Sequence, residues 1–363
     1  MLGAGGGHGG GHGGGHGGGH GGGHGGGHGG GHGGGHGGGH GGAHAGGPGS
    51  SMLSHALAVT HDATVGFWNP VPSTLTTPPA PPTLDTLEYL SGVRRHQVLF
   101  GSLIGRFRVT PLSGGKGAAL SLDTHEICSI AKPDDTIFKE QLVWLRNYAD
   151  LRPDRISEIV LQTGDLLSFY GSAVFLNDSR RKKTLELLAL VQAVAITVEM
   201  QIKHHCWSPR PIDFAPQVQP IIQTPDHSSF PSGHATEAYA LATVLERLQG
   251  KQSAQAGIDA RAMSYRIAHR IAVNRTVAGV HFPVDSAAGA VLGCMIAEAV
   301  HSVALGLAPQ KLSYGADGIA LGGTEDFVQK WLVDSFRPAA LSEAVASDPM
   351  LATFWHAAAA EWS

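Results

Sequence analysis

Two cations stand close together in residues 203–211, which read KHHCWSPRP. Lys203 closes a long apolar stretch that we expect to be helical. Pro211 holds Arg210 in extended backbone, because a residue before proline is disfavoured in the helical region. One cation then lies at a helix end and the other on a stiff loop. This arrangement suits an anion, although two solvated side chains at a helix end would give the same sequence.

A second cluster, FPSGH at residues 230–234, precedes a helix-forming run. Ser232 is a good N-cap, and Gly233 lets an anion approach the backbone closely. Unpaired amides and the helix dipole make such a start a natural oxyanion site. His234 would lie in the first turn, beside whatever the amides hold. An ordinary capped helix with a stray histidine is the structural alternative.

The third cluster, residues 274–285, reads NRTVAGVHFPVD. Asp285 follows His281 by four residues, close enough to accept the Nδ1 proton and leave Nε2 basic. A histidine oriented in this way suits nucleophilic attack or binding to a metal centre. Arg275 offers a planar fork for an oxyanion. We expect the three clusters to meet in one site for a tetrahedral oxyanion.

The elements that must position these clusters are mainly helices. Apolar residues recur every three or four positions in residues 184–204, the stripe of an amphipathic helix packed on others. Strand alternation is hard to find. We therefore predict an all-α fold, a bundle of eight or nine helices. The expected helices cover residues 84–104, 137–151, 156–176, 184–204, 235–249, 260–273, 283–307, 325–336 and 341–362.

Two further segments precede this predicted domain, which spans residues 84–363. Residues 1–50 repeat Gly-Gly-Gly-His, with ten histidines between positions 8 and 44. So much glycine prevents a helix, so we expect a disordered tail that could bind divalent metal ions loosely, with metal storage as the alternative. Residues 51–83 end in a proline-rich run and are predicted to be an arm or linker.

Composition excludes several classes of protein. The net charge of −4 gives no pull toward nucleic acid. Cys128, Cys206 and Cys294 are odd in number and widely spaced, so they are expected to be reduced thiols. Acidic residues interrupt the apolar stretches 185–202 and 284–308, so we expect core helices and no membrane span. No signal peptide is recognisable, and we expect a soluble protein of undetermined compartment and oligomeric state.

The three clusters together resemble the signature of the type 2 phosphatidic acid phosphatase (PAP2) and vanadium-dependent haloperoxidase superfamily. The resemblance covers about residues 180–308 and depends on the order and spacing of Lys203, Arg210, Pro211, Pro231, Ser232, Gly233, His234, Arg275, His281 and Asp285. Asn274 stands where the family usually has serine, and we expect it to tune the site. The resemblance implies a helical bundle of the PAP2/haloperoxidase type.

The resemblance also implies a role for each matched residue. Lys203, Arg210 and Arg275 would balance the charge of phosphate or vanadate, and Ser232 and Gly233 would donate further hydrogen bonds. No divalent cation is expected at this site.

The two histidines have different roles in the two branches of the superfamily. In a phosphatase, His281 would attack phosphorus and His234 would protonate the leaving alcohol, with Asp285 orienting His281. In a haloperoxidase, His281 would bind the vanadium of a vanadate cofactor.

We favour a vanadium-dependent haloperoxidase-like enzyme that oxidises halide with hydrogen peroxide. His227, five residues before Ser232, is similarly placed in vanadium bromoperoxidases and could support the site. Against this, Met200 replaces a tryptophan that many haloperoxidases carry. The alternative is a metal-independent acid phosphatase that hydrolyses phosphomonoesters through a phosphohistidine. A non-enzymatic phosphate- or metal-binding scaffold is the second alternative.

Overall fold

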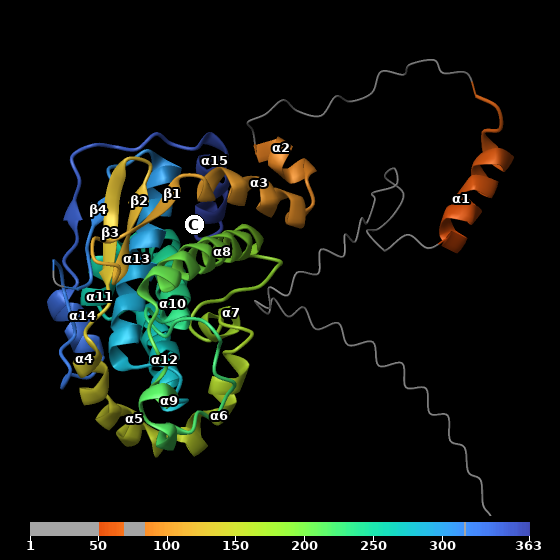
Figure 1. Ribbon diagram of the computed structural model, residues 1–363. Coiled ribbons are helices and arrows are strands. Elements are labelled where there is room, and N and C mark those ends of the chain that lie inside the picture. Colours follow the sequence, from red (N-terminus) through yellow and green to blue (C-terminus); the bar gives the residue numbers. More distant parts are fainter. Residues whose placement is uncertain (1–50, 69–83, 316) are drawn as a thin grey trace, which may run out of the picture.

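The computed structural model describes residues 51–68, 84–315 and 317–363 (Figure 1). The Gly-His repeat and the proline-rich run lie outside these residues, so the predictions of a disordered tail and a linker stay predictions. The arm also contains a helix that was not predicted, α1 (Ser51–Thr64), none of whose residues is buried.

The described residues are mostly helical, with 58% helix and 8% strand. Four helices form its centre, namely α8 (Lys182–Cys206), α10 (Gly233–Leu245), α12 (Met263–Val277) and α13 (Pro283–Leu305). Every residue of α13 except Leu305 is buried, so helices and strands surround it on all sides. The predicted helices 184–204 and 283–307 agree with α8 and α13 to within two residues at each end.

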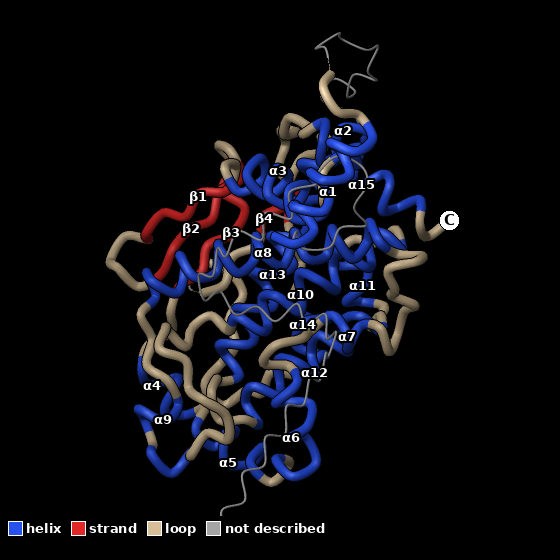
Figure 2. The backbone as a smooth tube through the Cα atoms, turned by 90° about the vertical axis from the view of Figure 1, so that its right-hand side faces the viewer, coloured by secondary structure: helices blue, strands red, loops and turns tan. Residues whose placement is uncertain are grey.

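The prediction of an all-α fold was wrong in one region. Residues 107–131 form an antiparallel sheet in the order β1-β2-β3, made of β1 (Phe107–Pro111), β2 (Gly117–Leu122) and β3 (His125–Ala131). Figure 2 shows these strands at one edge of the helical body. Five of the six residues of β2 are buried, so the strand shows no alternation of polar and apolar residues that sequence inspection could detect.

Several predicted helices are shorter or divided. The predicted helix 84–104 is two helices, which are divided at Leu90 and Ser91. The last helix, predicted over residues 341–362, begins only at Pro349, and proline is favoured in the first turn of a helix. A two-stranded sheet, β4 (Gln310–Lys311) and β5 (Ala339–Ala340), was not predicted and lies between the predicted helices. The remaining helices are α2 (Leu84–Tyr89), α3 (Gly92–Ile104), α4 (Asp135–Glu140), α5 (Leu142–Ala149), α6 (Arg152–Leu161), α7 (Leu167–Tyr170), α9 (Pro211–Phe214), α11 (Ala254–Asp259), α14 (Gln329–Ser335) and α15 (Pro349–Ala360).

Helices α10 and α13 approach each other through glycines of α13. A methyl group on Gly293 would lie 2.1 Å from the carbonyl oxygen of Thr236, and one on Gly289 would lie 2.5 Å from that of Ser232. No side chain other than hydrogen fits at these two contacts. The starts of the two helices are therefore held at a fixed separation.

Two segments are long and apolar enough to cross a membrane by length and composition, contrary to the prediction that neither qualifies. They are Lys182–Phe214, whose most apolar stretch is 50% buried, and Pro283–Leu305, whose stretch is 94% buried. The burial of α13 is that of a core helix. The three cysteines are free and buried, as predicted.

Candidate active site

The three sequence clusters meet where four helices end. The last turns of α8 and α12 lie beside the first turns of α10 and α13. The Ser232 amide donates to the carbonyl oxygen of Asp285 at 2.8 Å, and Lys203 Nζ donates to that of Pro231 at 2.5 Å. Two helix N-termini thus face the same region, where their dipoles favour an anion.

Lys203 is buried in the last turn of α8. Besides Pro231, its Nζ reaches the carbonyl oxygens of Ser228 at 3.0 Å and Ser229 at 3.5 Å. Burial lowers the pKa of Lys203 to about 8, opposed by the nearby carboxyl of Glu199. The lysine therefore binds the loop that leads to Ser232 and places a positive charge beneath it.

Arg210 has extended backbone, φ −84° and ψ 162°, as expected before Pro211. Its guanidinium donates to carbonyl oxygens of His227 at 3.0 Å and Val280 at 3.0 Å. Its Nη1 also lies 3.1 Å from Nε2 of His281. Arg210 therefore joins the second and third clusters.

Ser232 caps α10 with its side chain, which accepts from the Ala235 amide at 3.4 Å. Gly233 is the first helical residue, and a methyl group there would lie 2.4 Å from Oε1 of Glu199. His234 follows, with Nε2 donating to the carbonyl oxygen of Gln162 at 3.0 Å, which leaves Nδ1 as its free nitrogen. Burial and the charge of Arg275 lower the pKa of His234 to about 3.

Arg275 is fully buried near the end of α12. Its Nη2 donates to Gln162 Oε1 at 2.8 Å and to the carbonyl oxygen of Ile159 at 3.2 Å. Its Nε and Nη1 are buried and have no hydrogen-bond partner within the described ranges. A buried charged donor without an acceptor is costly, so these atoms are the clearest indication of an anionic ligand.

His281 and Asp285 form the expected pair. His281 Nδ1 lies 3.1 Å from Asp285 Oδ2, which also accepts from Ser229 Oγ at 2.5 Å and from the Phe282 amide at 2.9 Å. Burial raises the pKa of Asp285 to about 6, while burial and the neighbouring cations hold the pKa of His281 well below its usual range. The imidazole is therefore neutral, with Nε2 basic and facing Arg210.

His227 and Asn274, the two residues predicted as supports of the site, lie behind its arginines. His227 Nδ1 lies 3.2 Å from Arg210 Nη2, and burial lowers the pKa of His227 to about 4. The Asn274 amide donates to Glu158 Oε2 at 2.9 Å and to Gln162 Oε1 at 3.0 Å. Asn274 therefore fixes the acceptor that holds Arg275.

Sequence inspection missed several contributors. Gln162 and Ser229 lie outside the motifs and reach the site through contacts that no spacing rule predicts. Glu199 and Glu237 could have been predicted to lie near the site, because an acidic residue on an otherwise apolar helix is rarely buried unless a charged partner is close. Both lie one helical turn from a motif residue.

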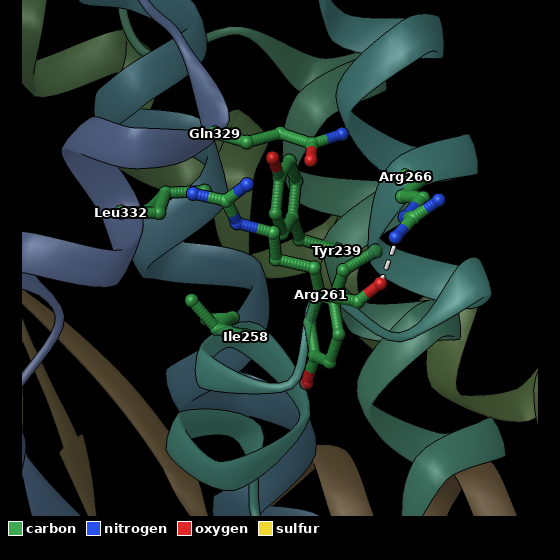
Figure 3. A pocket seen from close by; sticks show the side chains of 7 residues that line it. Tyr239, Ile258, Arg261, Arg266, Gln329 and Leu332 are labelled. Carbon is green, nitrogen blue, oxygen red and sulfur yellow. Dashed lines mark hydrogen bonds between the residues drawn. The ribbon is translucent and has the colours of Figure 1, made fainter.

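Two small hollows among the described residues lie away from this site. One, of about 10 Å³, is lined by residues of α10 to α12 and α14 and has room for about one water molecule. Figure 3 shows Arg261 and Arg266 beside it, with Arg266 bonded to the Arg261 carbonyl oxygen at 2.9 Å. Among the described residues, no group of three or more His, Cys, Asp or Glu side chains could hold a metal ion.

Comparison with known proteins gives a family match over the residues that form this site. Residues 183–307 match the sequence profile of the PAP2 superfamily. An 88-residue stretch is 32% identical to decaprenylphosphoryl-5-phosphoribose phosphatase from two strains of Mycobacterium tuberculosis, CDC 1551 / Oshkosh and ATCC 25618 / H37Rv. The match covers 24% of this chain and 44% of the relative, so the chain spans less than half the length of the relatives it matches.

Proposed function

Because residues 183–307 belong to the PAP2 superfamily, we propose that this chain is a phosphatase that hydrolyses phosphomonoesters without a metal ion. The similarity to a named phosphatase supports this alternative over the haloperoxidase that the sequence pattern favoured. One observation carries the proposal. The unpartnered donors of buried Arg275 belong to the same site as His281, whose Nδ1 is held by Asp285.

Binding of the phosphoryl group follows from the available donors. Arg275 Nε and Nη1 would bind phosphate oxygens, and the amides at the start of α10 would add weaker contacts. Lys203 and Arg210 are already bonded to backbone carbonyls, so they contribute mainly charge. This binding needs no divalent cation.

The chemistry then proceeds in two steps. His281 Nε2 attacks phosphorus, an N–P bond forms, and the P–O bond to the leaving alkoxide breaks. His234 gives that alkoxide a proton from Nδ1, since Nε2 is held by Gln162, and a bound phosphate raises its low pKa by supplying negative charge. Water then attacks phosphorus and gives a proton to His234, an O–P bond forms, and the N–P bond to His281 breaks to release inorganic phosphate. Asp285 stabilises the cationic imidazole in both steps.

The test uses the purified full chain with an aryl phosphate in the presence of a chelator. We expect release of phosphate, inhibition by orthovanadate, and a phosphohistidine that can be trapped by an alkaline quench, in which its N–P bond is stable. His281→Ala should abolish all three, and His356→Ala, a change of an exposed histidine on α15, should abolish none.

Two results would replace this proposal. Oxidation of bromide by hydrogen peroxide after loading with orthovanadate, without phosphatase activity, would favour the haloperoxidase. The donor set around Arg275 would accept vanadate as readily as phosphate, because the two oxyanions have the same shape and charge. Neither activity, with oxyanion binding retained, would favour the scaffold, and deletion of residues 1–50 would then test the tail.

A further inference from the structure

Two acidic side chains lie beside the candidate active site and have no role in the steps above. Glu199 is one helical turn before Lys203 on α8 and is only 4% exposed. Glu237 is one turn after Gly233 on α10. Burial raises the pKa of both carboxyls, and for Glu199 the charge of Glu237 raises it further.

The two carboxyls are held in place by different contacts. Glu199 Oε1 lies against Gly233, and its Oε2 is buried with no hydrogen-bond partner in the part of the chain that the structure describes. Glu237 Oε2 accepts a hydrogen bond from Gln192 Nε2 at 2.8 Å. Glu199 therefore faces the start of α10, where the proposed site would hold its anion.

The groups facing this pair are mostly cationic. The positive charges of Lys203 on α8 and Arg210 on the following loop lower the pKa of Glu199, and so does the hydroxyl of Thr236 on α10. The positive charges of Lys203 and of Arg275, which is on α12, lower the pKa of Glu237. Each of these groups favours the ionised carboxyl and opposes the effect of burial.

A charge count shows what these contacts imply. With both glutamates ionised and Asp285 ionised on α13, three carboxylates face the three cations Lys203, Arg210 and Arg275. The net charge of the site would then be zero, and a dianion would find no electrostatic attraction. With the glutamates protonated, the same site has a net charge of +2.

We propose that Glu199 and Glu237 form a proton-accepting pair that competes with the oxyanion for Lys203 and Arg275. Binding of a tetrahedral dianion draws about one proton from solvent onto the pair, and release of the anion returns it. The inference rests on the proposed function for its substrate, a phosphomonoester, but it applies to any tetrahedral dianion. Together with Lys203, whose pKa burial lowers to about 8, the pair sets the pH above which the site loses phosphate.

The test measures binding of sulfate to the full chain by calorimetry. Sulfate is not hydrolysed and stays a dianion at both about pH 5.5 and about pH 8.5, so any pH dependence belongs to the protein. Glu237→Gln removes one charge and keeps an acceptor for Gln192. Glu246→Gln, at the far end of α10 where Glu246 bonds Ser264, is the matched control.

We expect Glu237→Gln to bind sulfate about tenfold more tightly than wild type at about pH 8.5 and equally at about pH 5.5. The control should match wild type at both. Titrations in two buffers of different ionisation enthalpy should count about one proton taken up per sulfate near neutral pH in wild type, and fewer in Glu237→Gln.

A second variant protects the test against misfolding. Gln192→Leu removes the hydrogen bond that lowers the pKa of Glu237, so sulfate binding should persist to higher pH than in wild type. Weaker or unchanged binding by Glu237→Gln at about pH 8.5, or no proton uptake in wild type, would overturn the inference and leave the pair a structural support.

Failure of the inference and failure of the proposed function give different results. Hydrolysis of an aryl phosphate without proton-coupled sulfate binding removes only the inference. Proton-coupled sulfate binding without hydrolysis removes only the proposed function.

Discussion

Replacing Asp285 with asparagine should lower activity and raise stability. The side chain is fully buried, and its Oδ2 accepts three hydrogen bonds, from Ser229, Phe282 and His281. Asparagine has the same size and can keep an acceptor at that position, so Asp285→Asn removes mainly the charge.

The loss of activity follows from the contact with His281. Opposite charges about 4 Å apart attract by about 4 kcal/mol at an effective dielectric constant of about 20. That attraction is absent for neutral imidazole and present once His281 becomes cationic. We therefore expect kcat to fall by about 10³ near pH 7, at one factor of ten per 1.36 kcal/mol.

The gain in stability follows from the pKa of Asp285, which burial raises from 3.8 to about 6. Because the pKa of this carboxyl is higher in the folded protein than in the unfolded chain, its ionisation lowers the stability of the fold. This loss of stability is absent below pH 3.8 and complete above about pH 6. The upper limit of that cost is about 3 kcal/mol. Asp285→Asn should recover part of it at pH 8 and none near pH 4.

The assay combines kcat on an aryl phosphate with urea unfolding at both pH values. Ser229→Ala is the control, because it removes one hydrogen bond to the same oxygen and keeps the charge. Its kcat should change by less than about tenfold. A kcat for Asp285→Asn within tenfold of wild type, or a variant less stable than wild type at pH 8, would refute this reasoning.

Three further predictions test other interactions of the protein. Gly293→Ala should lower the free energy of unfolding by about 3 kcal/mol, because its methyl group would meet the α10 backbone. The control is Gly101→Ala on α3, which has open space and should raise that free energy by about 0.5–1 kcal/mol. Urea titration measures both. Burial lowers the pKa of His269 to about 4, so the folded protein loses stability through this histidine as the pH falls below 6.5. His269→Leu removes this loss, so between pH 8 and about pH 4.5 its free energy of unfolding should rise by about 2 kcal/mol relative to wild type in the same assay. Arg275→Lys keeps the charge and loses the planar donors, so kcat/KM should fall about 100-fold while thermal stability, measured in parallel, identifies any misfolded protein.

The helices that carry the motifs could be predicted from sequence because each has a local signal. Pro283 fixes the start of α13, and Ser232 caps α10. Residues inside the motifs could be named for the same reason, and the structure brings them together. Their catalytic roles stay proposals.

The remaining parts could not be predicted because their causes are not local. The strands of the sheet are short, and β2 is covered on both faces, so its sequence gives no alternation. Gln162 takes part in the site through contacts more than a hundred residues away, to Asn274 and Arg275. Lys203 binds backbone carbonyls, which every residue type provides, so no pattern of side chains reveals its partners.

The glycine contact between α10 and α13 restricts how this site could be changed. Gly289 lies under Ser232, and Gly293 lies one turn further along, so backbone meets backbone with no side chain between them. A substitution at either glycine cannot bring the two helices closer together, and it could only force them apart at a cost in stability. Evolution or engineering toward a larger or smaller anion would have to alter the loop between α8 and α10, whose carbonyl groups bind Lys203 and Arg210.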